Sequence, residues 1–261
     1  MNSQLPAEIA AIRQSHARLT ELVEGLDPAA LTGEAYPSEW SIAQVLSHLG
    51  SQAEIAVIMS EAGLNGTAAP GREEMEPIWA EWNAKSAEAQ ARDSIESNER
   101  FLALLDGLDG DQIESYRMQF LGSEVDLAGF GRLRLSEHAV HSWDISVALD
   151  PSAKLALDAV ELLVDHLGMV AGWSGKPSPE PYRVLVVTTD PARQLLVSVA
   201  DAVSVAPYDD AAGSPVDGTV EMPAEAFIRL VYGRLDPDHT PPVKESGSRG
   251  LSDLRPVFPG F

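Results

Sequence analysis

Apolar residues recur at helical spacing through the first 150 residues, and this pattern restricts the possible fold more than any other feature of the sequence. Intervals of three and four residues place side chains on one face of an α-helix. In residues 7–26 such a face is formed by Ile9, Ile12, Leu19, Val23 and Leu26, with His16 inside the stripe. The spacing therefore predicts an amphipathic first helix whose apolar face is buried.

Three more long helices are predicted in the same region. One begins after Ser41, a residue type favoured at helix N-caps, and runs to Gly63. Residues 65–77 contain the Gly, Pro and Asn typical of a loop, residues 78–108 form the third helix, and residues 132–149 form the fourth. Four long helices without convincing strands between them predict a four-helix bundle.

The second part of the sequence has a different character. Asp150-Pro151 interrupts the helical pattern, and a bridging helix is expected over about 151–172. Pro223 is expected at the start of a helix. Strand-like segments rich in Val precede it, at residues 182–190, 194–209 and 217–223. The predicted fold class is α+β, with a helical domain at 1–150 and a smaller α+β domain at 151–261.

Charge and cysteine content exclude several functions. The net charge of −22 opposes binding to a phosphate backbone, so no nucleic-acid partner is expected. Because the chain has no cysteine, a metal site would use His, Asp or Glu, and any thiol chemistry needs a thiol from outside. Neither a signal peptide nor an apolar run of about 18 residues is apparent, so we expect a cytoplasmic protein without a membrane partner.

Glu137 and His141 are candidate metal ligands. On the fourth helix they are i, i+4 neighbours and face the same way. A metal would satisfy both polar groups within a partly apolar face, where burial without partners is costly. The alternative is a solvent-facing Glu137 beside a hydrogen-bonded core His141.

His48, in the middle of the second helix, is the candidate third ligand. Helical bundles hold metals between side chains of facing helices. Two imidazoles and one carboxylate leave coordination positions open, as in a reactive metal site. The alternative is another core histidine. His16 is expected to be a core residue, and His138 points about 100° away from Glu137 and is not expected to be a ligand.

Several motifs together resemble one known family. SEWSIAQVLSHLG (38–50) is similar to the W-x7-H segment of the mycothiol-dependent maleylpyruvate isomerase family, which belongs to the DinB-like helical superfamily. LSEHAVHSWDIS (135–146) is similar to its E-x3-H-x-W-D segment. AEAFIRLVYGRL (224–235) and LRPVFPGF (254–261) resemble its Gly-Arg helix and its chain end. The resemblance covers most of the chain and implies a DinB-like four-helix bundle followed by a smaller domain.

The resemblance also implies cofactors and residue roles. It implies a divalent metal, commonly zinc, bound by His48, Glu137 and His141, and mycothiol bound to that metal as the thiolate. A metal cation stabilises the thiolate, which is the nucleophilic form. Arg234 matches the Gly-Arg arginine and is implied to reach the site, where its guanidinium could hold a substrate carboxylate. The alternative for Arg234 is a surface arginine that complements a helix C-terminus.

Other residues near the motifs have two interpretations each. Asp144 could accept the free N–H of a ligand histidine, or it could face solvent. Trp40 and Trp143 are expected to pack in the protein rather than to stack on substrate.

The function predicted is therefore that of a metal-dependent enzyme with a thiol cosubstrate. Two chemistries stay open: S-transfer to an electrophile, and cis–trans isomerisation of a maleylpyruvate-like diacid. The negative net charge and the single placed cation, Arg234, favour transfer. A competing hypothesis is a non-catalytic small-molecule binding protein with a structural metal. A monomer or a homodimer is compatible with the sequence.

Overall fold

The computed structural model describes residues 5–36, 39–120, 122–210 and 215–260. The chain divides into two compact units, residues 1–153 and 154–261, which are described separately. Phe261, the last residue of the chain-end motif, lies outside the described residues. Among the helices of the described ranges, none has both the length and the hydrophobicity needed to cross a bilayer.

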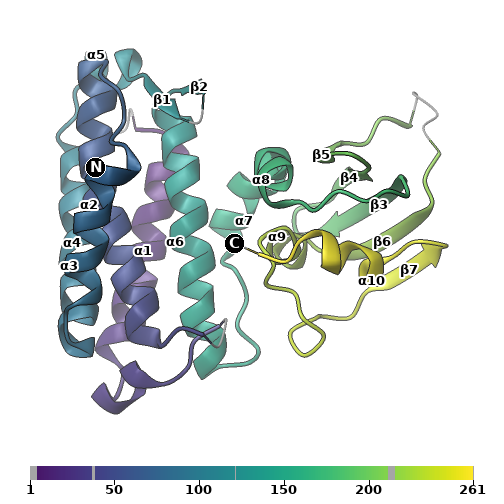
Figure 1. Ribbon diagram of the computed structural model, residues 1–261, viewed down its shortest axis with the longest axis horizontal. Helices are drawn as coiled ribbons and strands as arrows, with labels where there is room; N and C mark the ends of the chain where they lie inside the picture. Colours follow the sequence, from purple (N-terminus) through teal and green to yellow (C-terminus); the bar gives the residue numbers. More distant parts are fainter. Residues whose placement is uncertain (1–4, 37–38, 121, 211–214, 261) are drawn as a thin grey trace. The chain divides into compact units, whose positions relative to one another are not determined.

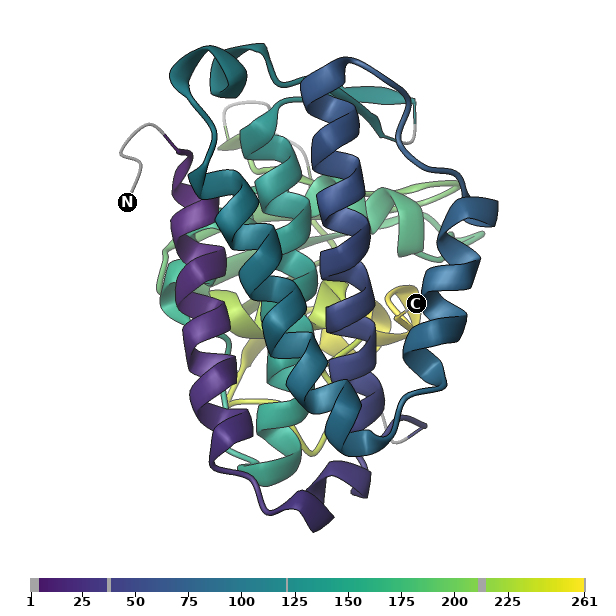
Figure 2. The same ribbon diagram turned by 90° about the vertical axis from the view of Figure 1, so that its left-hand side faces the viewer.

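Four long helices form the N-terminal unit, which confirms the predicted bundle. They are α1 (Ala7–Glu24), α2 (Ile42–Asn65), α4 (Ala87–Asp106) and α6 (Leu127–Leu149). α2 packs against α4 and α6, and α1 packs against α6 and α4, so the four helices surround a common core. Figure 2 shows α1 in purple, then α4 and α2, side by side in front of α6. The core contains apolar side chains from all four of these helices, including Leu19, Leu46, Ala91 and Ile145.

Local sequence determines where α2 starts and stops. The Ser41 hydroxyl accepts a hydrogen bond from the Gln44 amide, and the Gln44 side chain accepts one from the Ser41 amide. This capping box satisfies two amides that would otherwise lack a partner in the first turn. The helix ends at Gly66, whose φ of 62° is the left-handed conformation that favours glycine. Ser41 was predicted as the N-cap, and the helix extends two residues beyond the predicted end at Gly63.

The predicted third helix, 78–108, is wrong as a single element. The chain instead forms α3 (Arg72–Asn83), breaks at residues 84–86, and continues as α4. Ser86 causes the restart because its hydroxyl caps the new helix by accepting from the Ala89 amide. α3 begins within the predicted loop 65–77 and lies along the outside of α2 (Figure 2).

Short elements connect the long helices. A 3₁₀ helix, η1 (Pro28–Thr32), precedes α2. Between α4 and α6 lie α5 (Gly110–Ser115) and an antiparallel pair of three-residue strands, β1 (Met118–Phe120) and β2 (Ser123–Val125). The expectation that this region contains no strand is therefore wrong. α6 starts at Leu127, five residues before the predicted start, because the Asp126 carboxylate caps it by accepting from the Gly129 amide.

The C-terminal unit contains the predicted sheet. Its strands, drawn in green and yellow in Figure 1, follow the order β5-β4-β3-β6-β7, and only β3 and β6 are parallel neighbours. The bounds are β3 (Tyr182–Thr189), β4 (Arg193–Val199), β5 (Val203–Pro207), β6 (Gly218–Pro223) and β7 (Lys244–Gly247). In β3 every second side chain is buried, as expected for a strand with one covered face. β7 was not predicted.

Helices pack against this sheet. α9 (Ala224–Val231) follows Pro223 directly and is buried along its whole length. The bridging helix predicted over 151–172 is wrong as a single element, because the backbone leaves helical geometry at His166 (φ −118°, ψ 13°). The segment forms α7 (Leu157–Leu163), a 3₁₀ turn η2 (Val164–His166) and α8 (Leu167–Ser174). The chain closes with α10 (Leu251–Leu254) and a 3₁₀ turn, η4 (Arg255–Val257).

Candidate metal centre

Three side chains from two adjacent bundle helices meet at one point. His48 lies on α2, and Glu137 and His141 lie one turn apart on α6. Each residue offers one ligand atom, and the three ligand atoms lie within 4.8 Å of one another. The structure thus brings together all three residues that the sequence nominated as metal ligands.

The geometry centres on one carboxylate oxygen. Glu137 Oε2 is 3.2 Å from His48 Nε2 and 3.7 Å from His141 Nε2. The two imidazole rings have their centroids 4.5 Å apart and are inclined at 63°. Two nitrogen donors and one oxygen donor are a ligand set that suits zinc and related divalent ions and leaves coordination positions open.

Asp144 orients His141. Its Oδ2 is 2.9 Å from His141 Nδ1, so this nitrogen donates to the carboxylate and Nε2 is directed to the side of Glu137. Asp144 is fully buried, so the alternative of a solvent-facing aspartate is wrong. The contact agrees with the other interpretation of the sequence, an aspartate that accepts the N–H of the candidate ligand histidine.

Electrostatics favour the metal-binding protonation states. Burial lowers the pKa of His48 more than the Glu137 hydrogen bond raises it, so this imidazole is neutral at pH 7. Burial alone would raise the pKa of Glu137, but the side chain is still 41% exposed. The His48 hydrogen bond, followed by the charges of His141, His48 and Arg134, lowers this pKa to about 2. A neutral imidazole and an ionised carboxylate are the forms that bind metal.

Arg134 is a residue near the site that sequence reasoning missed. It is buried one turn before Glu137 on α6, and its Nη2 donates to Leu49 O at 3.0 Å and to Asn98 Oδ1 at 2.8 Å. Its positive charge is one cause of the low pKa of Glu137. The i, i+3 spacing of the two residues was visible in the sequence and was the signal that could have identified Arg134.

Trp40 lies over the two histidines. Its ring is 5.4 Å from the His48 ring and nearly parallel to the His141 ring at 6.2 Å. The indole is 37% exposed and contacts two protein rings, so the expectation that Trp40 packs rather than stacks on substrate stays a prediction. Trp143 does pack, since it is buried and its Nε1 donates to Ala153 O at 2.9 Å.

The other two histidines of the bundle are core residues, as expected for His16. His138 is fully buried, and its Nδ1 lies 2.9 Å from the Ser15 hydroxyl. His16 is buried on α1 and meets the His138 ring edge-on, with the centroids 6.0 Å apart.

Arg234 belongs to the C-terminal unit. It is only 7% exposed, so the alternative of a surface arginine is wrong. Its Nη1 donates to Tyr232 O at 2.7 Å, within the turn that follows α9. Gly233 in this turn has a φ of 73°, and a side chain there would collide with Gly260. The Gly-Arg and chain-end motifs therefore form one packed structure, while the predicted role of Arg234 in catalysis stays a prediction.

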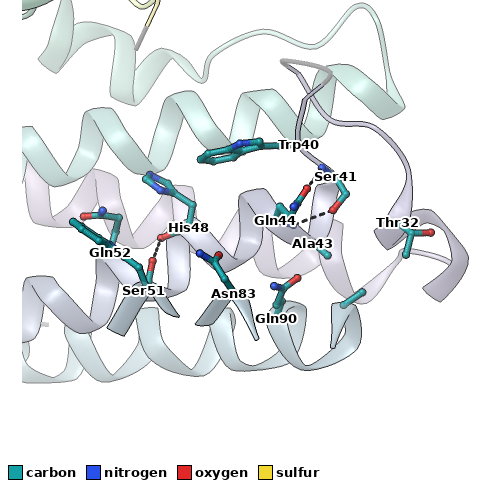
Figure 3. A pocket seen from close by; sticks show the side chains of 12 residues that line it. Thr32, Trp40, Ser41, Ala43, Gln44, His48, Ser51, Gln52, Asn83 and Gln90 are labelled. Atoms are coloured by element: carbon teal, nitrogen blue, oxygen red, sulfur yellow. Dashed lines mark hydrogen bonds between the residues drawn. The ribbon is translucent and has the colours of Figure 1, made fainter. Parts of the chain in front are cut away.

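An open cavity of about 940 Å³ adjoins the site. Its wall includes His48 and Trp40 (Figure 3), and the remaining lining residues come from η1, α2 and its N-cap, α3 and α4. The candidate ligand His48 is thus accessible to a small molecule.

Comparisons with known proteins identify the family. A model of the mycothiol maleylpyruvate isomerase N-terminal domain matches residues 12–146, and a model of the C-terminal domain of the same family matches residues 154–253. Among curated proteins no match was found.

Solved structures agree with this fold. A crystal structure of a mycothiol-dependent maleylpyruvate isomerase superposes with a TM-score of 0.69 at 14% identity, covering 96% of this chain and 98% of that chain. A histidine-to-alanine mutant of such an isomerase gives 0.66 at 13% identity, covering 90% and 92%. Since the two family models together span most of the sequence, the chain belongs to the mycothiol maleylpyruvate isomerase family, a family of enzymes.

Proposed function

We propose that this chain is a metal- and mycothiol-dependent enzyme whose divalent cation is bound by His48, Glu137 and His141. The observation that carries the proposal is the convergence of three ligand atoms within 4.8 Å on two packed helices. The contact between Asp144 and His141 adds support, because metal-bound histidines commonly donate their other ring N–H to a carboxylate. Zinc suits this donor set.

The residues of the chain prepare the site for a thiol. When bound, a divalent cation supplies Lewis acidity and lowers the pKa of a coordinated thiol. His48 stays neutral because it is buried, and Glu137 stays ionised because the hydrogen bond from His48 and the charge of Arg134 stabilise its carboxylate. Since the protein has no cysteine, the reacting sulfur belongs to the cosubstrate.

The shared chemical step is attack of the thiolate sulfur on an electrophilic carbon. In S-transfer the new S–C bond persists, and the leaving group departs with the electron pair of the bond that breaks. In isomerisation the sulfur adds to a conjugated C=C bond, the resulting single bond rotates, and the S–C bond breaks again to restore the double bond. Family membership supports isomerisation. The net charge of −22 disfavours attraction of a dianionic substrate and so favours S-transfer to an uncharged electrophile.

Metal content distinguishes this proposal from a non-catalytic binding protein. We expect about one metal ion per purified chain, and loss of most of it in His48→Ala and in Glu137→Gln, with folding retained by circular dichroism. Glu99→Gln, an exposed position on α4, serves as the control and should keep its metal. The readouts are elemental analysis and mycothiol-dependent turnover on panels of neutral electrophiles and cis-diacids. A folded, zinc-loaded protein without turnover on either panel would favour the binding protein.

A further inference from the structure

The cavity beside His48 is a groove along one face of α2. Gln44, His48 and Gln52 recur at i, i+4 on this face, and Trp79 and Asn83 of α3 form the opposite wall. From Ser41 to Gln52 the groove follows about 17 Å of helix, at a rise of 1.5 Å per residue. Figure 3 shows Trp40 and His48 together at one side, and Asn83 and Gln90 across the groove from them.

The wall is polar but carries no acidic residue, lysine or arginine. This is unusual in a chain in which 22% of residues are charged. Two indoles, four side-chain amides and several hydroxyls form most of the surface. Amides donate and accept hydrogen bonds side by side, which matches hydroxyl groups, and indole faces pack against the C–H face of a saturated ring. The wall therefore fits an uncharged, polyhydroxylated ring.

Several of these polar groups have hydrogen-bonding capacity available. Gln90 Nε2 donates to Trp82 O, which leaves its carbonyl oxygen for a ligand. Asn83 Oδ1 is 3.5 Å from the Ser47 hydroxyl, and its amide N–H groups are directed to no hydrogen-bond acceptor of the described residues. Gln52 likewise forms no side-chain hydrogen bond within the described part of the chain. Ligand hydroxyls would supply these partners.

The groove is continuous with the candidate metal centre. His48 belongs to the wall and to the triad, and the Trp40 ring spans both, 5.4 Å from His48 and 6.2 Å from His141. A thiol with its sulfur at the triad can therefore place the rest of the molecule along α2.

We propose that this groove binds the glycosyl–cyclitol part of the thiol cosubstrate, with Trp79 and Gln52 as its main contacts. The position of the sulfur rests on the proposed function, whereas binding of the rings does not. Mycothiol carries two such rings, glucosamine and inositol, attached to its cysteine. Thiols with carboxylates or phosphates, such as glutathione and coenzyme A, would find no cation on this wall.

The first experiment uses a probe without sulfur. N-acetylglucosaminyl-inositol is titrated into the metal-loaded full-length protein and followed by tryptophan fluorescence and calorimetry. We expect saturable binding, and about tenfold weaker binding in Trp79→Ala and in Gln52→Ala, the loss of roughly one good contact. Gln14→Ala, an exposed glutamine on α1, is the control and should bind like the wild type.

The second experiment uses turnover. In the same two variants the KM for mycothiol should rise about tenfold, while kcat and metal content stay unchanged. If the glycoside does not bind, or if Trp79→Ala and Gln52→Ala leave its affinity and the KM unaltered, the groove assignment is overturned while thiol-dependent activity stands. If the glycoside binds through these residues but the protein has neither metal nor turnover, the groove stands and the proposed function fails.

Discussion

At the scale of single residues, the candidate centre depends on a hydrogen bond behind it. Asp144 fixes which nitrogen of His141 carries the proton and therefore which nitrogen is directed at Glu137. Such contacts restrict the rotation of a ligand imidazole and increase its basicity. If the centre binds metal as proposed, its affinity depends on four residues, of which three carry the ligand atoms.

Asp144→Asn tests this dependence. The amide keeps the size of the side chain but removes its charge, and it can donate to Nδ1 as readily as accept from it. We expect metal affinity to fall about 10- to 100-fold, as for other partners of metal-bound histidines. A competition titration with a chelating indicator measures it. Asp126→Asn, at the N-cap of the same helix, is the control, because asparagine caps helices as well as aspartate does.

His16 makes stability depend on pH. Burial, then the charges of Arg134 and Arg13, lowers its pKa from 6.5 to about 4. Between these values the unfolded chain binds the proton and the folded chain does not, so stability is complete above pH 6.5 and declines as the pH falls toward 4.

Replacing His16 by leucine should therefore flatten the pH profile. Its Nδ1 has no hydrogen-bond partner among the described residues, and the position lies in an apolar stripe, so His16→Leu should fold. Between pH 7 and pH 5 the variant should lose about 2 kcal/mol less free energy of unfolding than the wild type. Urea unfolding at both pH values measures this, with Gln14→Leu on the same helix as control. Equal losses in all three proteins would contradict the assignment.

At the scale of elements, α2 and α4 approach closely at one glycine. A side chain on Gly50 would lie 2.2 Å from the Trp82 ring and 3.0 Å from Ser94 Cα. Ser97 also donates to Gly50 O at 2.9 Å, and the Trp82 indole is held by Glu54. The position of α2 is therefore fixed at Gly50, two residues after His48, by its contacts with α4 and Trp82.

Gly50→Ala should destabilise the protein even though alanine favours helices. The collision with the Trp82 ring is expected to cost about 1–3 kcal/mol, more than the gain of about 1 kcal/mol in helix propensity. Gly172→Ala in α8, where no heavy atom lies within 4 Å of the added methyl group, should be neutral or stabilising. Thermal unfolding of both variants distinguishes the packing cost from the gain in helix propensity, and an equally stable Gly50→Ala would show that the Trp82 ring can move aside.

The elements that the sequence predicted best are helices with a regular spacing of apolar residues or a recognisable N-cap residue. Residues 7–26 and the helix after Ser41 were predicted within a few residues. The break at residues 84–86 was missed because Ser86 lies in a region rich in Ala, Glu and Lys that suits a helix throughout. β7 was missed because its four exposed residues have no apolar alternation and pair only with β6.

The candidate site was partly predictable for a similar reason. The spacing of Glu137 and His141 on one helix places them together, whereas the approach of His48 depends on how α2 packs against α6, which family resemblance suggested and local pattern did not. The i, i+3 spacing of Arg134 and Glu137 could have placed the arginine near the site. Its buried contacts with Leu49 and Asn98 depend on tertiary packing and could not be predicted from that spacing.

At the scale of the whole molecule, two units carry the family motifs, and the candidate ligands all belong to the first. Arg234→Ala tests whether the second unit takes part in turnover. If its guanidinium binds an anionic group of the substrate, turnover should fall at least about tenfold with metal content unchanged. Arg234→Lys should recover only part of the activity, because lysine lacks the planar fork. Arg193→Ala, an exposed ion-pair residue of the same unit, is the control, and full activity in Arg234→Ala would remove the second unit from the mechanism.

The position of α3 outside the four-helix ring has an evolutionary consequence. The candidate ligands belong to α2 and α6, whereas Trp79 and Asn83 belong to α3, which packs mainly along the outer side of α2 and accepts one hydrogen bond from α4, at Trp82 O. Substitutions on the exposed face of α3 can therefore accumulate without disturbing the candidate ligands. If the groove binds the cosubstrate as proposed, such a division would let lineages with different low-molecular-weight thiols diverge in cosubstrate choice while they inherit the same triad.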